Sequence, residues 1–325
     1  MKSVFFDYPG PPKVLRIIET DIPKPNENQV LIKVKAAGVN RPDLLQREGI
    51  YPAPKGHSII LGLEVSGIIK KIGKKIKNLY LNDSVIALVD GGGYAEYCVV
   101  DQKQVCRKPK NITFIEAAGI PECFMTSWSN LVYRGKISQK KKVLIHGGTS
   151  GVGISAIQIS KLFNSEIYTT VGNEKKKKIC KELGVSEAIN YKKEDFYKII
   201  KEKTQKKGVN IILDMVGGDY VQKNIDLLSN DGKIINIAFQ KGSKIELNLM
   251  KVMLKRLTVT GSTLRIRDSN FKQKILKDLN KFVFPKIEVG SIKIIVDSVF
   301  KLEDVELAHK KLYNNSHIGK VILSL

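Results

Sequence analysis

The segment that decides the fold is residues 146–156, with the sequence HGGTSGVGISA. It follows the apolar run Lys142–His146, typical of a buried strand, and leads into a helical stretch from Ile154 to Phe163. The dinucleotide-binding spacing GxGxxG/A is met by Gly151, Gly153 and Ala156. Such a loop needs small residues because the chain turns sharply and its backbone approaches a pyrophosphate, which the N–H groups at the helix start attract. Strand, loop and helix signals agree, so we predict a dinucleotide site rather than a plain glycine turn.

Strand and helix signals alternate from about residue 124 onward. The further strands expected are 166–170, 188–190, 210–214, 233–237 and 258–260. This alternation indicates an α/β fold with a doubly wound parallel sheet, which we assign to a Rossmann domain over residues 124–266.

The two ends of the chain carry β signals of another kind. Residues 1–123 hold short strands and turns, such as the alternating run Val30–Ala36, and indicate a barrel-like β domain. We expect residues 267–325 to rejoin it, with a helix over Leu302–Leu312 and a last strand over Gly319–Leu325.

Composition limits the classes of protein that this chain can belong to. Its 325 residues exceed one ordinary core, which favours two domains. Four cysteines without a CxxC pair argue against a disulfide framework and favour the reducing cytoplasm. No apolar run approaches the roughly 20 residues that span a membrane. The net charge of +23 permits weak, salt-sensitive binding to nucleic acid, but the lysines are scattered and we interpret them as a solvated surface.

The end of the second strand of the parallel sheet predicts NADPH rather than NADH. NAD-binding sheets place an acidic residue there to hold the ribose 2′-OH. Here the strand ends in Thr170, Val171 and Gly172, and the acid Glu174 comes only later, followed by four lysines at 175–178. Ammonium groups attract a 2′-phosphate, although some of these lysines must be the solvated face of the next helix.

Five segments, in chain order, resemble the medium-chain dehydrogenase/reductase superfamily. They are residues 26–34, 37–43, 61–67, 146–156 and 318–321. Within that superfamily the chain is most similar to the zeta-crystallin-like NADPH:quinone oxidoreductases. The resemblance implies a GroES-like catalytic domain built from both chain ends, an inserted Rossmann domain and an active-site cleft where the two join. It also implies a homodimer, for which the segment Leu257–Ser262 is our candidate edge.

The same resemblance bears on metal binding. The alcohol dehydrogenase branch holds catalytic zinc with a cysteine, a histidine directly before a glutamate, and a second cysteine. Here these positions correspond to Asn40, to Leu63 beside Glu64, and to about Glu122, with Cys123 displaced by one. An asparagine amide and a leucine are not usual zinc ligands, so one carboxylate remains where three ligands are needed. We expect hydride transfer without a metal, and Cys123 packed as a small hydrophobe.

The resemblance also implies which residues form the site. Around the acceptor it places Asn40, Asp43, Gln46 and Tyr51. Tyr51 either hydrogen-bonds or protonates a quinone oxygen, or is an aromatic contact beside a proline turn. The expected cofactor contacts are Asn40 and Thr126 at the nicotinamide; Thr149, Ser150, Gly151 and Val152 at the pyrophosphate; Gly172, Lys176 and Tyr191 at the adenine ribose and 2′-phosphate; Ala238, Phe239 and Gln240 at the carboxamide; Leu264 and Arg265 closing the pocket; and Asn315 on the phosphate side.

The implied activity is zinc-independent, NADPH-dependent reduction of a quinone or a related electron-poor acceptor. Two alternatives stay open on the sequence. One is an enoyl-thioester or enone reductase on the same scaffold, with Tyr51 as the proton donor. The other is an RNA-binding or crystallin-like structural protein that uses the charge of the chain.

Overall fold

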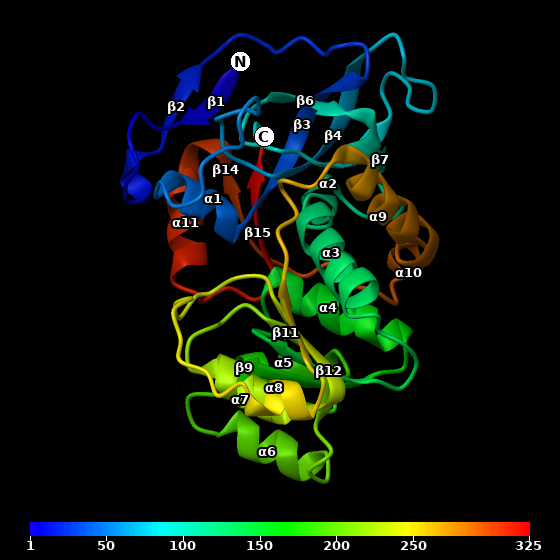
Figure 1. Ribbon diagram of the computed structural model, residues 1–325. Helices are drawn as coiled ribbons and strands as arrows, with labels where there is room; N and C mark the ends of the chain where they lie inside the picture. The colour runs from blue at the N-terminus through cyan, green and yellow to red at the C-terminus, as the bar shows by residue number, and fades with distance from the viewer. The chain divides into compact units, whose positions relative to one another are not determined.

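The chain folds into two units, which the computed structural model describes over all residues, Met1–Leu325 (Figure 1). One unit contains Met1–Met125 and Arg265–Leu325, and the other contains Thr126–Leu264. The domain boundaries expected from the sequence lie at 123/124 and 266/267.

The unit Thr126–Leu264 is built on a six-stranded sheet in which every neighbouring pair is parallel. Its strands are β8 (Lys142–His146), β9 (Glu166–Val171), β10 (Glu187–Asn190), β11 (Val209–Asp214), β12 (Leu228–Asn236) and β13 (Thr258–Gly261), in the order β10-β9-β8-β11-β12-β13. The predicted doubly wound parallel sheet is confirmed. Parallel strands are covered on both faces, and Leu144, Ile212 and Ile234 are accordingly fully buried.

Helices connect these strands. They are α4 (Gly151–Leu162), α5 (Glu174–Glu182), α6 (Phe196–Lys203), α7 (Tyr220–Leu227) and α8 (Met250–Leu254), with a π-helical turn over Ser129–Arg134 after the shared helix α3 (Pro121–Trp128). Helix α4 begins at Gly151 rather than at the expected Ile154. It starts earlier because the Ser150 hydroxyl accepts a hydrogen bond from the Gly153 N–H at 2.9 Å and caps the first turn.

The unit formed by both chain ends contains a second, mostly antiparallel sheet. Its strands are β3 (Gln29–Val39), β4 (Glu64–Ile72), β5 (Ser84–Leu88), β6 (Tyr97–Asp101), β7 (Val105–Arg107), β14 (Val296–Lys301) and β15 (Lys320–Ser324), with the order β14-β15-β3-β4-β5-β7 and β6 paired to β3. A separate hairpin pairs β1 (Lys2–Phe5) with β2 (Arg16–Glu19). In Figure 1 the blue strand β3 lies beside the red strand β15, so the two ends of the chain share one sheet.

Five helices complete this unit. They are α1 (Arg41–Arg47), α2 (Phe114–Ala117), α9 (Ser269–Phe282), α10 (Phe284–Glu288) and α11 (Val305–Tyr313), with 3-10 turns at Pro12–Val14, Gln102–Gln104 and Leu302–Asp304. The single helix expected over Leu302–Leu312 is therefore a 3-10 turn followed by α11. No helix in the protein has the length and apolar character needed to cross a membrane.

Candidate functional site

The glycine loop lies between β8 and α4, and its glycines leave the backbone without side chains at these positions. A Cβ at Gly153 would lie 2.2 Å from the carbonyl oxygen of Gly147, and one at Gly148 would lie 2.1 Å from Oγ1 of Thr169. Gly147 has a φ of +69°, a region that favours glycine. The loop therefore fits a nucleotide pyrophosphate, which needs close approach of the backbone.

The residues expected at the pyrophosphate all belong to this loop or to the first turn of α4. Thr149 is buried, whereas Ser150, Gly151 and Val152 are partly exposed. The Ser150 hydroxyl donates to the Gly147 carbonyl at 2.8 Å while it caps the helix, so it holds the loop in shape. The amides of Gly151 and Val152 stand in the first helical turn, where N–H groups have no carbonyl of the helix to bond.

The residues expected at the 2′-phosphate gather at the ends of β9 and β10. A Cβ at Gly172 would lie 3.1 Å from the Tyr191 hydroxyl, so these two residues are neighbours. The N–H of Lys176 donates to the capping side chain of Asn173 at 2.9 Å, which places Lys176 in the first turn of α5. Glu174 accepts a hydrogen bond from the side chain of Asn190 at 2.7 Å, and Glu194 accepts one from the Asn190 N–H at 2.7 Å.

The four lysines at 175–178 have different environments. Lys177 forms an ion pair with Glu194 at 2.9 Å. Lys175 and Lys178 are exposed, while Lys176 is partly buried. Part of the run is thus the solvated helix face that the sequence also allowed, and Lys176 remains our candidate for a phosphate.

The other expected contacts in this unit lie farther along the chain. Ala238, Phe239 and Gln240 form the loop after β12, where the Gln240 N–H donates to the Met215 carbonyl at 3.3 Å. The Thr126 carbonyl accepts from Asn130 Nδ2 at 2.8 Å. Leu264 is partly buried at the end of the unit.

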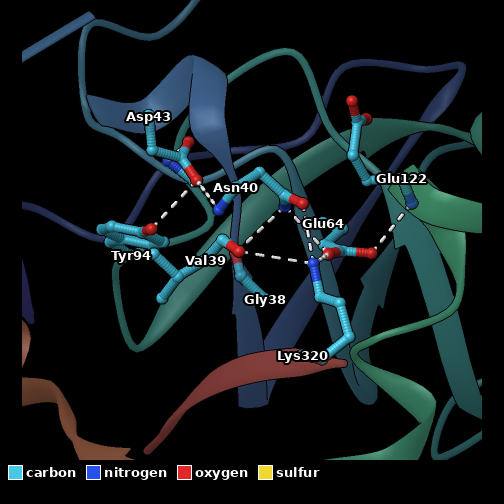
Figure 2. Close-up of polar contacts among 9 residues, drawn as sticks. Gly38, Val39, Asn40, Asp43, Glu64, Tyr94, Glu122 and Lys320 are labelled. Atoms are coloured by element: carbon cyan, nitrogen blue, oxygen red, sulfur yellow. Dashed lines mark hydrogen bonds and ion pairs between the residues drawn. The ribbon is translucent and has the colours of Figure 1, made fainter. Parts of the chain in front are cut away.

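In the unit formed by both chain ends, Asn40 has its side-chain amide held on both sides (Figure 2). Its Oδ1 accepts from Lys320 Nζ at 2.7 Å, and its Nδ2 donates to Glu64 Oε1 at 2.8 Å. Lys320 also donates to Glu64 Oε1 at 2.6 Å, and the side chains of both charged residues are almost fully buried. Burial by itself lowers the pKa of Lys320, but Cys123, Glu64 and Glu122 together raise it.

Asp43 is buried and does not line an open surface. Its carboxylate accepts hydrogen bonds from the N–H of Asn40 at 2.8 Å, from the hydroxyl of Tyr94 at 2.9 Å and from the N–H of Gly62 at 3.2 Å. The first of these belongs to a capping box at the start of α1. Burial raises the pKa of Asp43 to about 6, and the three donated hydrogen bonds limit that rise. Its position indicates that it holds α1 and Tyr94 rather than an acceptor.

Gln46 and Arg265 bind each other. Arg265 Nη1 donates to Gln46 Oε1 at 2.9 Å, and its Nη2 donates to the Asp90 carbonyl at 2.9 Å. Lys272 Nζ in turn donates to Asp90 Oδ1 at 2.5 Å and to the Arg265 carbonyl at 2.9 Å. Arg265 is thus anchored within the unit of the chain ends, where it fixes the amide of Gln46.

Tyr51 has a half-buried ring with the guanidinium of Arg265 at 5.7 Å from its centroid. Burial raises the pKa of the Tyr51 hydroxyl, the positive charge of Arg265 lowers it, and the negative charge of Glu122 raises it. The residue therefore lies among charged groups, which a plain contact beside a proline turn does not require. Asn315, by contrast, is exposed and accepts from Arg41 Nη2 at 2.8 Å.

The residues at the positions of zinc ligands do not fit a metal ion. No group of three or more His, Cys, Asp or Glu side chains is arranged to hold one. Asn40 and Glu64 both face the Lys320 ammonium, which is itself a cation. Cys123 is buried, and burial raises the pKa of its thiol to about 12, which disfavours the thiolate that zinc needs.

Two functional features escaped the sequence reasoning. Lys320 lies in the segment 318–321, but the sequence gives no sign of its role, because its partners lie more than 250 residues away. The linkage of Arg265 to Asp90 and Lys272 likewise has no local signal. Only the pairing of β15 with β3, and the packing of α9, bring these side chains to their partners.

Comparison with known proteins gives matches along the whole chain. Residues 26–110 match the family model of the alcohol dehydrogenase GroES-like domain, and residues 151–281 match that of zinc-binding dehydrogenase. The chain is similar to the quinone oxidoreductase of Homo sapiens, with 30% identity over 319 residues that cover 97% of this chain and 95% of that protein.

Solved structures agree. The quinone oxidoreductase of Escherichia coli complexed with NADPH superimposes with a TM-score of 0.90 and 28% identity over 100% of both chains. The CurF ER cyclopropanase from the curacin A biosynthetic pathway superimposes with a TM-score of 0.88 and 26% identity over 99% of this chain and 98% of that one. The predicted combination of a GroES-like domain and a Rossmann sheet is confirmed. With a human relative at 30% identity over nearly its full length, the chain is an oxidoreductase and belongs to the quinone oxidoreductases of the medium-chain dehydrogenase/reductase superfamily.

Proposed function

We propose that this protein is an NADPH-dependent quinone oxidoreductase that works in the cytoplasm without a catalytic zinc ion. The observation that carries the proposal is the loop before α4, where a Cβ at Gly148 or Gly153 would lie within about 2.2 Å of other protein atoms, so only glycine allows the tight strand-to-helix turn that dinucleotide-binding loops use. The NADPH bound to the Escherichia coli relative supports the cofactor, and the names of that relative and the human one support a quinone acceptor. Four free cysteines suit a reducing compartment.

NADPH, when bound, supplies the hydride, and the protein binds and orients it. The amides of Gly151 and Val152 would hold its pyrophosphate at the positive end of the α4 dipole. Lys176, with Gly172 and Tyr191 nearby, would hold the 2′-phosphate. Glu174 lies in the first turn of α5 rather than at the end of β9, and its Oε1 accepts a hydrogen bond from Asn190 at 2.7 Å, so the usual strand-end position of the acid that favours NADH is not filled.

On the acceptor side, the chain supplies fixed polar groups. Arg265 fixes the amide of Gln46, and Lys320 with Glu64 fixes that of Asn40. Tyr51 offers a hydroxyl that can hydrogen-bond a quinone oxygen. Since Asn40 and Glu64 are engaged by an ammonium group, the observed donor set supports chemistry without zinc.

We also propose that the protein is a homodimer joined through β13. This strand is the last in the parallel sheet, and Val259 at its centre is 44% exposed. An exposed edge offers unpaired N–H and C=O groups to a second strand. The neighbouring helix α8 adds the exposed apolar side chains Met250, Met253 and Leu254. The net charge of +23 would add only weak, salt-sensitive binding to nucleic acid.

The test is NADPH oxidation by the purified protein against 1,2-quinones, 1,4-quinones and a 2-enoyl thioester in parallel, repeated with NADH and with a chelator. We expect turnover of at least one quinone, preference for NADPH, and no effect of the chelator. Lys176→Ala should raise KM for NADPH about 10- to 100-fold, the equivalent of a lost charge-assisted hydrogen bond. The exposed neighbour Lys175→Ala is the matched control and should keep the wild-type KM. Turnover of the thioester alone, or loss of activity with the chelator, would contradict the proposal.

A further inference from the structure

Three carboxyl groups and one ammonium group lie together in the unit of the chain ends: Asp43, Glu64, Glu122 and Lys320 (Figure 2). The carboxyl groups of Asp43 and Glu64 each accept three hydrogen bonds. Asp43 accepts from three groups, as described above. Glu64 accepts from Lys320 Nζ at 2.6 Å, from Asn40 Nδ2 at 2.8 Å and from the N–H of Glu122 at 2.8 Å.

The carboxyl group of Glu122 differs from the other two, because it accepts no hydrogen bond from the protein. Glu122 lies in the first turn of α3 and contributes only its backbone N–H, which donates to Glu64. Figure 2 shows its carboxyl group turned away from Lys320 and Glu64, with no contact drawn to it. The residue is partly exposed, so this group is accessible in a way that Asp43 and Glu64 are not.

The charges that face Glu122 come from every element around it. Glu64 of β4 and Asp43 of α1 oppose its negative charge, whereas Lys320 of β15 and Lys272 of α9 favour it. Both lysines are already paired, Lys320 with Glu64 and Lys272 with Asp90.

Further groups lie within reach of the same charge. The negative charge of Glu122 raises the pKa of Tyr51 and that of Arg265, and Cys123 is the next residue along α3. Burial, and then the nearby carboxylate of Glu64, raise the pKa of Glu122 to about 8. At neutral pH, Glu122 is therefore a partly exposed carboxylic acid near the tyrosine proposed to meet the acceptor.

We propose that Glu122 donates the proton that accompanies hydride transfer to the acceptor. A quinone becomes a hydroquinone by gaining one hydride, which brings two electrons, and one proton. The O–H bond of the Glu122 acid breaks, an O–H bond forms on the reduced acceptor oxygen, and the resulting carboxylate takes a proton from water before the next turnover. The inference rests on the proposed quinone reduction and adds to it the source of the proton.

The test compares wild type with Glu122→Gln, which keeps the shape and removes the acid. Wild-type kcat with NADPH and a quinone should decline as the pH rises through about 8, because the acid form is lost. Glu122→Gln should lower kcat about 10²-fold or more at pH 7, as expected for loss of a general acid, and should abolish the decline near pH 8. Glu202→Gln, the same change at an exposed position on α6, should behave as wild type.

Two further measurements keep the test decisive. Difference infrared spectra between pH 7 and pH 9, taken without cofactor, should show loss of a protonated carboxyl band in wild type and not in Glu122→Gln. Tyr51→Phe should retain the decline of kcat near pH 8, which separates the acid from the tyrosine. Wild-type turnover with an unchanged rate and pH profile in Glu122→Gln would overturn the inference. Absence of wild-type turnover with any quinone would instead overturn the proposed function.

Discussion

Lys320 is a buried charged residue, and its contribution to the stability of the protein depends on its hydrogen-bond and ion-pair partners. Removing two charges from water is costly, and the ion pair is stable only when every donor and acceptor is supplied. Here the ammonium has Asn40 Oδ1, Glu64 Oε1 and the Val39 carbonyl at 2.6–3.3 Å. Gly38 permits this arrangement, since a Cβ there would lie 2.1 Å from Glu64 Oε1.

Lys320→Met should therefore destabilise the protein by about 3–5 kcal/mol, because Glu64 would be left as an unpaired buried charge. The measurement is the free energy of unfolding by urea. The double variant Lys320→Met with Glu64→Gln should recover a large part of the loss, since both charges are then removed. If the single variant is as stable as wild type, the ion pair does not have the role given to it here.

At the scale of elements, the two sheets each end in a strand with an exposed valine. Val259 lies on β13 of the parallel sheet, and Val299 lies on β14 of the other sheet, with 44% and 47% exposure. Helix α8 beside β13 exposes three apolar side chains, Met250, Met253 and Leu254, whereas α11 beside β14 exposes two, Leu307 and Tyr313. Burial of apolar surface is the main driving force of association, so β13 is the better candidate edge.

Val259→Lys should convert the protein from a dimer to a monomer, because lysines on paired edges repel and remain hydrated. Size-exclusion chromatography with light scattering measures the mass directly. Val299→Lys is the matched control, an equally exposed valine on the other edge, and should leave the mass at twice that of one chain. A monomeric wild type would refute the dimer, and a dimer that only Val299→Lys dissociates would relocate the interface.

At the scale of the whole molecule, the raised pKa of Glu122 couples stability to pH. In the unfolded chain this carboxyl group titrates at its ordinary pKa of 4.5, and in the folded protein at about 8. Between these values the folded state binds more protons, so the free energy of unfolding falls as the pH rises and levels off above 8. The buried His309 acts with the opposite sign, because burial lowers its pKa to about 3 and only the unfolded chain binds its proton, near the ordinary pKa of 6.5; this contribution is nearly complete above about pH 7.5 and is the same in wild type and in Glu122→Gln.

From pH 6.5 to pH 8.5, wild type should lose on the order of 1–2 kcal/mol of stability from this group, after discounting for solvent screening. Urea denaturation at several pH values is the measurement. Glu122→Gln should show a flatter curve and be more stable than wild type at pH 8.5, while Glu202→Gln should follow wild type. Parallel curves for wild type and Glu122→Gln would show that this carboxyl group is ionised throughout the range.

The sequence alone was enough to predict the features that depend on residues close together along the chain. The glycine loop, the strand runs such as Lys142–His146 and the alternation of strands with helices are local patterns, because strand and helix periods repeat within a few residues. The boundaries of α4 and of the segment before α11 were less well predicted, since a capping side chain and a 3-10 turn decided them.

The burial, the hydrogen-bond partners and the charge of the site residues were decided by the tertiary structure. The sequence named Asn40, Asp43, Gln46 and Tyr51, and ruled Leu63 out as a zinc ligand, but it could not show that Asp43 is buried as a cap. Nor could it show that Lys320 meets Glu64 across 256 residues, or that Arg265 meets Gln46 across 219. Hydrogen bonding and burial set the charge of each group, and both arise only when strands and helices distant in the chain pack together.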